Sequence, residues 1–143
     1  MKIIFLCTAN SCRSQIAEAW ARHLLPPHWE IHSAGLITYP ITRETRRAMQ
    51  EVGLDMVGQE SKILDNFELD DFDLVVTLSE EAGRFLPTLR FADRHWHQPL
   101  QDPMGAVGTE EEVRSAFREA RDEIKRLVEE IGSANEPHSS MDS

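Results

Sequence analysis

The sequence predicts a single α/β domain in which helices flank a four-stranded parallel sheet. The chain has 143 residues, the length of one domain. Short apolar runs alternate along it with segments of helical periodicity, which is the pattern of strand–helix–strand units. The first run, residues 2–6, is apolar almost throughout, as in strands buried on both faces of a parallel sheet. Such folds bind ligands beyond the carboxyl ends of their strands, so the segment after residue 6 is the first candidate for a site.

The first half of the chain is expected to supply two strands and two helices. From Ser14 onward apolar residues return at helical spacing, until the Pro26-Pro27 pair stops the helix. Residues 29–33 alternate between apolar and polar side chains, which predicts a second short strand after residues 2–6. A second helix is expected over residues 43–52.

The second half is expected to complete the sheet. Residues 72–78 have an apolar centre and predict the third strand. Ser79 has N-cap chemistry and opens a short helix that ends near Pro87. Residues 94–97 are expected to form a short fourth strand.

The clearest helix comes last and is expected to end at Gly132. Its apolar positions follow helical spacing for about five turns: Val113, Ala116, Phe117, Ala120, Ile124, Leu127, Val128 and Ile131. The predicted domain therefore spans residues 1–132. Residues 133–143 are rich in Ser, Asn and Pro and are expected to be a disordered tail.

The composition excludes several functional classes. Hydrophobic residues make up 41% and charged residues 28% of the chain, as in ordinary globular proteins. No apolar run reaches the ~18 residues of a membrane helix, and nothing resembles a secretory signal, so we expect a cytoplasmic protein without a membrane partner. The formal net charge of −10 argues against nucleic-acid binding. An anionic ligand would have to be attracted locally, by one cationic side chain and backbone N–H groups.

Residues 7–14, C-T-A-N-S-C-R-S, join the first strand to the first helix and contain both cysteines of the chain. A loop at this place can turn successive backbone N–H groups toward an anion, and the helix that follows adds its positive end. Such surroundings favour a thiolate, which makes Cys7 a candidate nucleophile. Arg13 can clamp two oxygens of a tetrahedral anion, and Ser14 can donate a hydrogen bond to the sulfur.

The same residues also have a purely structural interpretation. Cys7 could be a small buried side chain and Arg13 a surface charge, and a C-x5-R match is frequent by chance. The strand before the loop, the helix after it and the two cysteines within it favour the catalytic interpretation. Cys12 is left with three roles: a resolving thiol, a partner that protects an oxidised Cys7, or loop filler. No histidines lie at ligand spacing, so no metal site is expected, and Tyr39 is expected on the surface rather than in a pocket wall.

The segment C-T-A-N-S-C-R-S-Q-I-A-E-A-W resembles the active-site loop of arsenate reductases built on the low-molecular-weight protein tyrosine phosphatase fold. The resemblance spans residues 2–131. Gln15 matches the reductase branch, since phosphatases of the family usually have proline there. The other matching stretches are Ser33-Ala34-Gly35, Ser61-Lys62, Val75-Val76-Thr77-Leu78, His95-Trp96, Asp102-Pro103, Phe117-Arg118 and Arg121-Asp122-Glu123-Ile124-Lys125.

The resemblance implies a role for each residue of the loop and for one distant carboxylate. Cys7 would be the nucleophile and Arg13 the oxyanion clamp, while Asn10 and Ser14 would shape the loop and stabilise the thiolate. Asp102 would be the general acid for the departing oxygen, worth about 10²–10⁴-fold in rate. By residue type alone, an Asp before Pro is an ordinary turn residue. The oxyanion would be held by Thr8, Ala9, Asn10, Ser11, Cys12 and Arg13.

The sequence departs from the family pattern where thioredoxin-coupled members carry two further cysteines. Ser79 and Leu86 stand at those positions, so a relay of three protein thiols is impossible. The Cys7 adduct would be resolved by an external thiol (glutathione, mycothiol, or a glutaredoxin- or thioredoxin-type partner) or by Cys12. No tightly bound cofactor is expected. Ala9 replaces the usual glycine, which costs free energy if that position needs a positive φ.

Three functions remain open at this point. Reduction of arsenate to arsenite is the leading one. The first alternative is hydrolysis of phosphate monoesters, phosphotyrosine included, through a Cys7-phosphate intermediate, because arsenate and phosphate share shape and charge. Gln15 argues against it, as does Met104-Gly105 where phosphatase relatives place tyrosines. The second alternative is a non-enzymatic module that binds oxyanions or senses redox state, with Cys7 and Cys12 as its switch.

Overall fold

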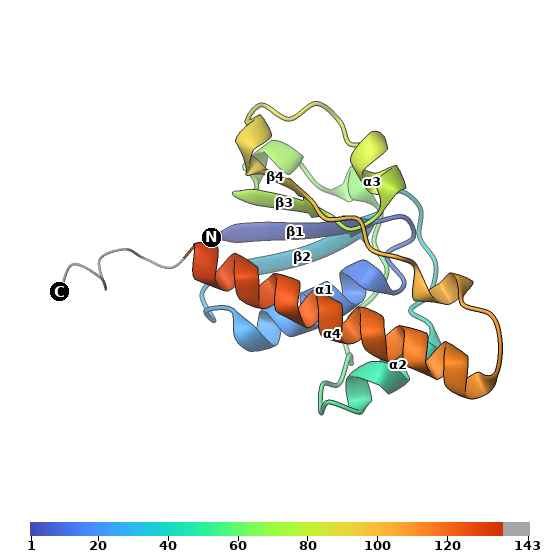
Figure 1. Cartoon of the computed structure of the whole chain (residues 1–143). Coiled ribbons are helices and arrows are strands. Elements are labelled where there is room, and N and C mark those ends of the chain that lie inside the picture. The colour runs from blue at the N-terminus through green and yellow to red at the C-terminus, as the bar shows by residue number, and fades with distance from the viewer. Residues whose placement is uncertain (136–143) are drawn as a thin grey trace.

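The fold is built on a four-stranded sheet whose strands all run parallel, in the order β2-β1-β3-β4 (Figure 1). The computed structural model describes residues 1–135. The strands are β1 (Lys2–Cys7), β2 (Glu30–Gly35), β3 (Leu74–Thr77) and β4 (His95–His97). The helices are α1 (Arg13–Leu24), α2 (Arg43–Gln50), α3 (Glu80–Arg84) and α4 (Glu110–Ala134). The predicted fold class is confirmed.

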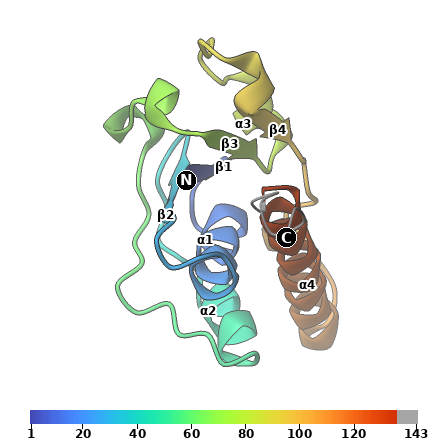
Figure 2. The same ribbon diagram turned by 90° about the vertical axis from the view of Figure 1, so that its left-hand side faces the viewer.

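The central strand β1 contributes to two hydrophobic clusters, one on each face of the sheet. Successive side chains of a strand point to opposite faces. Ile3 and Phe5 pack with α1 and α4, whereas Ile4 and Leu6 pack with Phe72 on the other face. Figure 2 shows α1 and α4 together on one side of the sheet. Because both faces are covered, β1 is buried from its second residue onward, as its apolar sequence predicts.

The long helix α4 is fixed at its start by a cap and near its middle by ion pairs to the residue that follows α2. Thr109 and Glu112 form a reciprocal capping box at its first turn. Glu51, which directly follows α2, accepts hydrogen bonds from Arg118 and Arg121. Hydrogen bonding from Arg118, followed by that from Arg121, lowers the pKa of Glu51 to about 2. The carboxylate therefore stays ionised, and the two helices stay paired, throughout the neutral range.

The C-terminal end of α4 lies beyond the predicted one. The helix continues through Gly132 to Ala134, so the expected break at Gly132 does not occur. Gly132 serves packing instead, since a Cβ there would lie 3.1 Å from the side chain of Leu25. Asn135 ends the helix by donating to the carbonyl four residues earlier. Residues 136–143 of the expected tail lie outside the described residues. None of the helices within residues 1–135 has the length and hydrophobicity of a membrane-spanning segment.

Candidate active site

A cavity of about 230 Å³ opens at the carboxyl end of β1. The strand ends at Cys7 and α1 begins at Arg13, and the loop between them lies against the cavity. The structure thus brings Asp102, from the segment before α4, to the same cavity as the loop. The lining residues are Cys7, Thr8, Ala9, Ser11, Cys12, Arg13, Ile37, Tyr39, Asp102 and Met104.

The sulfur of Cys7 lies 2.8 Å from the hydroxyl oxygen of Ser14, and both residues are buried. The same hydroxyl oxygen accepts a hydrogen bond of 2.7 Å from the side-chain amide of Asn10. An amide nitrogen can only donate, so the hydrogen of Ser14 is left to point at the sulfur. The Ser14 hydroxyl can therefore donate a hydrogen bond to the sulfur of Cys7. This is the arrangement that the sequence predicts for Ser14.

The side chain of Asn10 is held in one orientation. Its Oδ1 accepts from the backbone N–H of Lys62 at 2.7 Å, and this donor fixes which end of the amide faces Ser14. Its Nδ2 also donates to Ser33 at 2.9 Å. Asn10 has a φ of 50°, a left-handed conformation that asparagine tolerates better than most residues. Ala9 has no positive φ, so the expected cost of replacing glycine there does not arise.

The backbone N–H groups of the loop are free to bind a ligand. Within residues 1–135, none of the amides from Thr8 to Cys12 donates a hydrogen bond to another group. Buried amides normally find a partner, and a run of free ones at a strand-to-helix junction is the signature of an anion site. The loop can therefore accept an oxyanion through its main chain, as the sequence predicts.

Arg13 is anchored from behind and reaches the cavity. Its Nη1 donates to the carbonyls of Leu100 at 2.9 Å and Leu78 at 3.4 Å, and the residue is only 7% exposed. Its Nη2 lies 3.4 Å from Oδ2 of Asp102. A guanidinium held by two carbonyls offers its remaining N–H groups in a fixed geometry, which suits the clamping of a tetrahedral anion.

Asp102 fits both of its sequence-based interpretations. Its Oδ1 accepts from the backbone N–H of Met104 at 3.0 Å and so caps the short turn at Pro103–Gly105. Its other oxygen faces Arg13, and the side chain is 45% exposed at the cavity. The carboxyl therefore lines the same cavity as Cys7, and its role as general acid stays a prediction.

Cys12 lies in the same cavity as Cys7 but in different chemical surroundings. Burial raises the pKa of Cys12 to about 12, and a hydrogen bond from Thr45 opposes this only in part. Cys12 is 2% exposed and is a neutral thiol at physiological pH. Because the thiolate is the attacking species in thiol exchange, the burial of Cys12 and its raised pKa disfavour it as the resolving thiol.

Sequence reasoning missed the apolar walls of the cavity. Ile37 and Tyr39 follow the end of β2, and Met104 precedes α4; they are 58%, 56% and 40% exposed. Tyr39 was expected on the surface and is exposed, but it also forms part of the wall. The available signal was the position of Ile37 and Tyr39, two residues apart, just beyond the carboxyl end of a strand.

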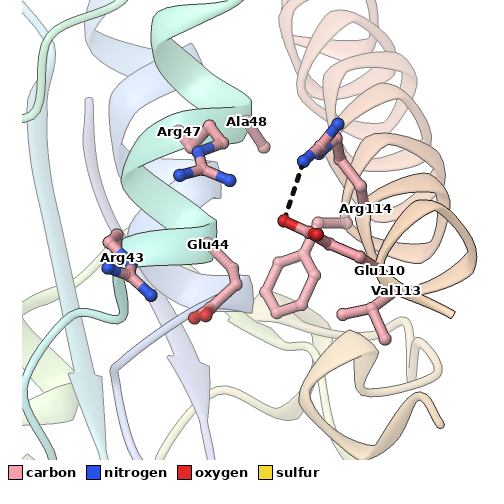
Figure 3. A pocket seen from close by; sticks show the side chains of 8 residues that line it. Arg43, Glu44, Arg47, Ala48, Glu110, Val113 and Arg114 are labelled. Carbon is pink, nitrogen blue, oxygen red and sulfur yellow. Dashed lines mark hydrogen bonds and ion pairs between the residues drawn. The ribbon is translucent and has the colours of Figure 1, made fainter. Parts of the chain in front are cut away.

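A second cavity, of about 280 Å³, lies between α2 and α4. Figure 3 shows side chains from the two helices facing it, with Glu110 and Arg114 joined by an ion pair of 3.2 Å. The apolar part of its lining is Ala48, Val113 and Phe117. It contains no cysteine or other strong nucleophile, so the active site is assigned to the cavity at Cys7. Among the described residues, no group of His, Cys, Asp and Glu side chains is arranged to hold a metal ion.

The chain belongs to the low molecular weight phosphotyrosine protein phosphatase family, whose model matches residues 2–137. This membership agrees with the resemblance seen in the loop and gives the class to which the chain belongs.

Within this class the chain is similar to arsenate reductases. It is 42% identical over 129 residues to the arsenate reductase of Bacillus subtilis, covering 90% of this chain and 93% of the relative. It is 38% identical over 131 residues to that of Staphylococcus aureus, covering 92% and 95%. A solved arsenate reductase in its phosphate-binding state superimposes with a TM-score of 0.82 at 31% identity, covering 94% of this chain and 98% of that one. The YwlE arginine phosphatase, at 23% identity and a TM-score of 0.75 over 94% of this chain and 95% of that one, shares the fold.

Proposed function

We propose that the protein is an enzyme that reduces arsenate to arsenite, with Cys7 as its nucleophile. The observation that carries the proposal is the Cys7 sulfur, 2.8 Å from the Ser14 hydroxyl, beside a loop whose amides are free to bind an oxyanion. Arsenate as that oxyanion is supported by the similarity to arsenate reductases over 90% of the chain. The two free cysteines and the need for a thiol reductant suit the reducing cytoplasm.

The first step is attack on arsenic. Arsenate binds to the loop amides and to Arg13, which together neutralise its charge. The Cys7 thiolate attacks arsenic, and an S–As bond forms as an As–O bond breaks. Asp102 donates a proton to the departing hydroxyl group of arsenate, which leaves as water. Arsenic is still As(V) in the resulting Cys7 adduct.

The second step reduces arsenic. A thiolate from outside the chain attacks the sulfur of Cys7, and the S–As bond breaks with its electron pair left on arsenic. Arsenic leaves as arsenite, As(III), and Cys7 is left in a mixed disulfide. A second thiol releases Cys7 by exchange, so two thiols are oxidised to one disulfide for each arsenate. The reductant is placed outside the chain because Cys12 is buried with a pKa raised to about 12.

Hydrolysis of phosphate monoesters is the second candidate. The loop that would hold arsenate would also hold a phosphoryl group, and water would replace the thiol in the second step. The chain lacks two cysteines of the thioredoxin-coupled reductases, with Ser79 and Leu86 at their positions. This observation favours a phosphatase side activity, but the similarity to arsenate reductases makes reduction the main function.

The test is arsenite production by the purified protein. Dithiothreitol, glutathione with glutaredoxin, mycothiol with mycoredoxin, and thioredoxin are supplied in parallel, with p-nitrophenyl phosphate hydrolysis measured beside them. We expect arsenite with at least one thiol system and none from Cys7→Ser, because an alcohol there does not ionise usefully. Phosphate release without arsenite under every condition would instead make the protein a phosphatase. Turnover by Cys7→Ser would refute the mechanism.

A further inference from the structure

The mouth of the active-site cavity carries three exposed apolar side chains, Ile37, Tyr39 and Met104, which we call the rim. Their exposed fractions are 58%, 56% and 40%, whereas the Cys7 sulfur belongs to a residue that is 3% exposed. Arsenate is fully polar and gains nothing from apolar walls. Large apolar side chains left in water at the entrance to a site mark a surface that something else covers.

The rim is held in place by the catalytic loop. The backbone N–H groups of Leu36, Ile37 and Tyr39 donate to three successive loop carbonyls, those of Cys7, Thr8 and Ala9, at 3.3, 3.0 and 3.2 Å. Gly35 permits this approach, because a Cβ there would lie 2.7 Å from the backbone nitrogen of Asn10. Ile37 and Tyr39 are therefore fixed in their exposed positions by the same loop that carries the nucleophile.

The proposed reaction requires a thiol to enter at this mouth. The chain has two cysteines, and Cys12 is a buried neutral thiol, so the resolving sulfur comes from outside. A small thiol such as glutathione carries two carboxylates. The lining of the cavity offers one cation, Arg13, which is already held by two carbonyls and paired with Asp102. With Asp102 in the wall and a net charge of −10, the mouth is a poor receptor for an anionic small thiol.

We infer that the rim is the docking surface for a protein that presents the resolving thiol. This inference rests on the proposed arsenate reduction and names the class of its second substrate: a thiol–disulfide protein whose reactive cysteine lies in an apolar exposed loop. Docking places that cysteine over Cys7, where its thiolate displaces arsenite and forms the mixed disulfide. Arsenic gains the two electrons, and a second thiol of the partner then closes a disulfide and frees Cys7. Covering Ile37 and Tyr39 supplies the apolar contact that an entering small thiol lacks.

The test compares protein reductants with dithiothreitol on the same variants. Ile37→Ser and Tyr39→Ser each remove one apolar side chain of the rim. Val57→Ser is the control, because Val57 is 81% exposed and lines a different groove. For glutaredoxin, mycoredoxin and thioredoxin, the measured quantity is kcat/KM for the protein divided by kcat/KM for dithiothreitol. We expect this ratio to fall about tenfold in each rim variant, as for central interface residues, and to stay constant in the control.

Three results would overturn the inference. One is an unchanged ratio in both rim variants. Another is a fall of the same size in Val57→Ser, which would show that loss of exposed apolar surface anywhere has the effect. The third is turnover with dithiothreitol but with none of the protein reductants. Failure of the unaltered protein to form arsenite even with dithiothreitol is a different outcome, since it rejects arsenate reduction itself and the inference with it.

Discussion

The side-chain amide of Gln15 donates to Asn10 twice, to Oδ1 at 2.9 Å and to the backbone oxygen at 3.1 Å. Gln15 is fully buried and also donates to the carbonyl of Glu60, while Gln59 donates to its Oε1 at 2.8 Å. A line of hydrogen bonds thus runs from Gln15 through Asn10 and Ser14 to the sulfur of Cys7. Gln15, which resembles the reductase branch at this position, thus joins the catalytic loop to Gln59 and Glu60.

We expect Ser14→Ala to slow the reaction of Cys7 with iodoacetamide at neutral pH by about tenfold, since a hydrogen bond to a charged group contributes roughly 1.5–3 kcal/mol. Cys12 contributes little to the signal because it is buried with a pKa raised to about 12. Ser11→Ala is the control, because the Ser11 hydroxyl faces the sulfur of Met104 at 3.4 Å. Equal alkylation rates in the two variants would remove Ser14 from thiolate stabilisation.

Arg13→Lys should weaken inhibition by phosphate by about tenfold or more, because a lysine cannot make two parallel hydrogen bonds to an oxyanion. The measurement is the inhibition constant of phosphate for arsenate reduction, with whichever thiol supports turnover as the reductant. Arg90→Lys is the control. It makes the same replacement of a guanidinium by an ammonium group in an exposed segment away from the site. An inhibition constant that does not move in Arg13→Lys would contradict the clamp.

Cys12→Ser should retain most of the turnover supported by an external thiol. The reason is that burial keeps Cys12 protonated, with its pKa raised to about 12, so it contributes little attacking thiolate at neutral pH. Arsenite production with dithiothreitol is the measurement, and Cys7→Ser provides the inactive reference. Loss of turnover in Cys12→Ser, with the fold intact by circular dichroism, would make Cys12 the resolving residue after all.

Stability should fall on mild acidification because of His95. Its Nε2 lies 2.8 Å from the hydroxyl of Thr77, which also meets Nδ1 of His97 at 2.7 Å. Burial, followed by the charge of His97, lowers the pKa of His95. The unfolded chain, with a histidine pKa of about 6.5, then binds more protons than the folded one. The stabilisation from neutral His95 is complete above the histidine pKa of the unfolded chain. It is lost as the pH falls through the lower pKa of His95 in the folded chain.

The urea midpoint is therefore expected to drop between about pH 7 and pH 5.5, as the pH falls through the histidine pKa of the unfolded chain. His95→Gln should make the midpoint less dependent on pH over this range, whereas His28→Gln, at an exposed turn, should not. A slope that is the same in His95→Gln and the unaltered protein would assign the acid sensitivity to other groups.

The sheet and the catalytic loop could be predicted because the information is local. The strand over residues 2–6 is a continuous apolar run, and the reactive residues from Cys7 to Ser14 are neighbours in the chain. Asp102 could not be placed from its own surroundings, because Asp-Pro also suits any turn. It reaches the cavity because β4 and the irregular segment after it pair with the end of β3, where the Leu78 carbonyl accepts from Leu100.

The properties of Cys12 and the rim were hidden for a different reason. The pKa of Cys12 depends on its burial and on Thr45, which comes from α2, more than thirty residues away in the sequence. Ile37 and Tyr39 read as ordinary loop residues, and it is their backbone bonds to the catalytic loop that hold them at the cavity. Such relationships arise from packing between distant segments rather than from a local pattern.

The orientation of Asn10, fixed by the backbone of Lys62, has a consequence for selectivity. A binding loop that is preorganised before its ligand arrives recognises only the shape and charge of a tetrahedral oxyanion. Arsenate and the far more abundant phosphate are nearly equal by that measure, so the rigid loop admits both. Discrimination between the two then depends on kinetics. Phosphate bound beside Cys7 dissociates unchanged, whereas arsenate is reduced by thiols and is released as arsenite. The protein would choose its substrate by reactivity rather than by affinity.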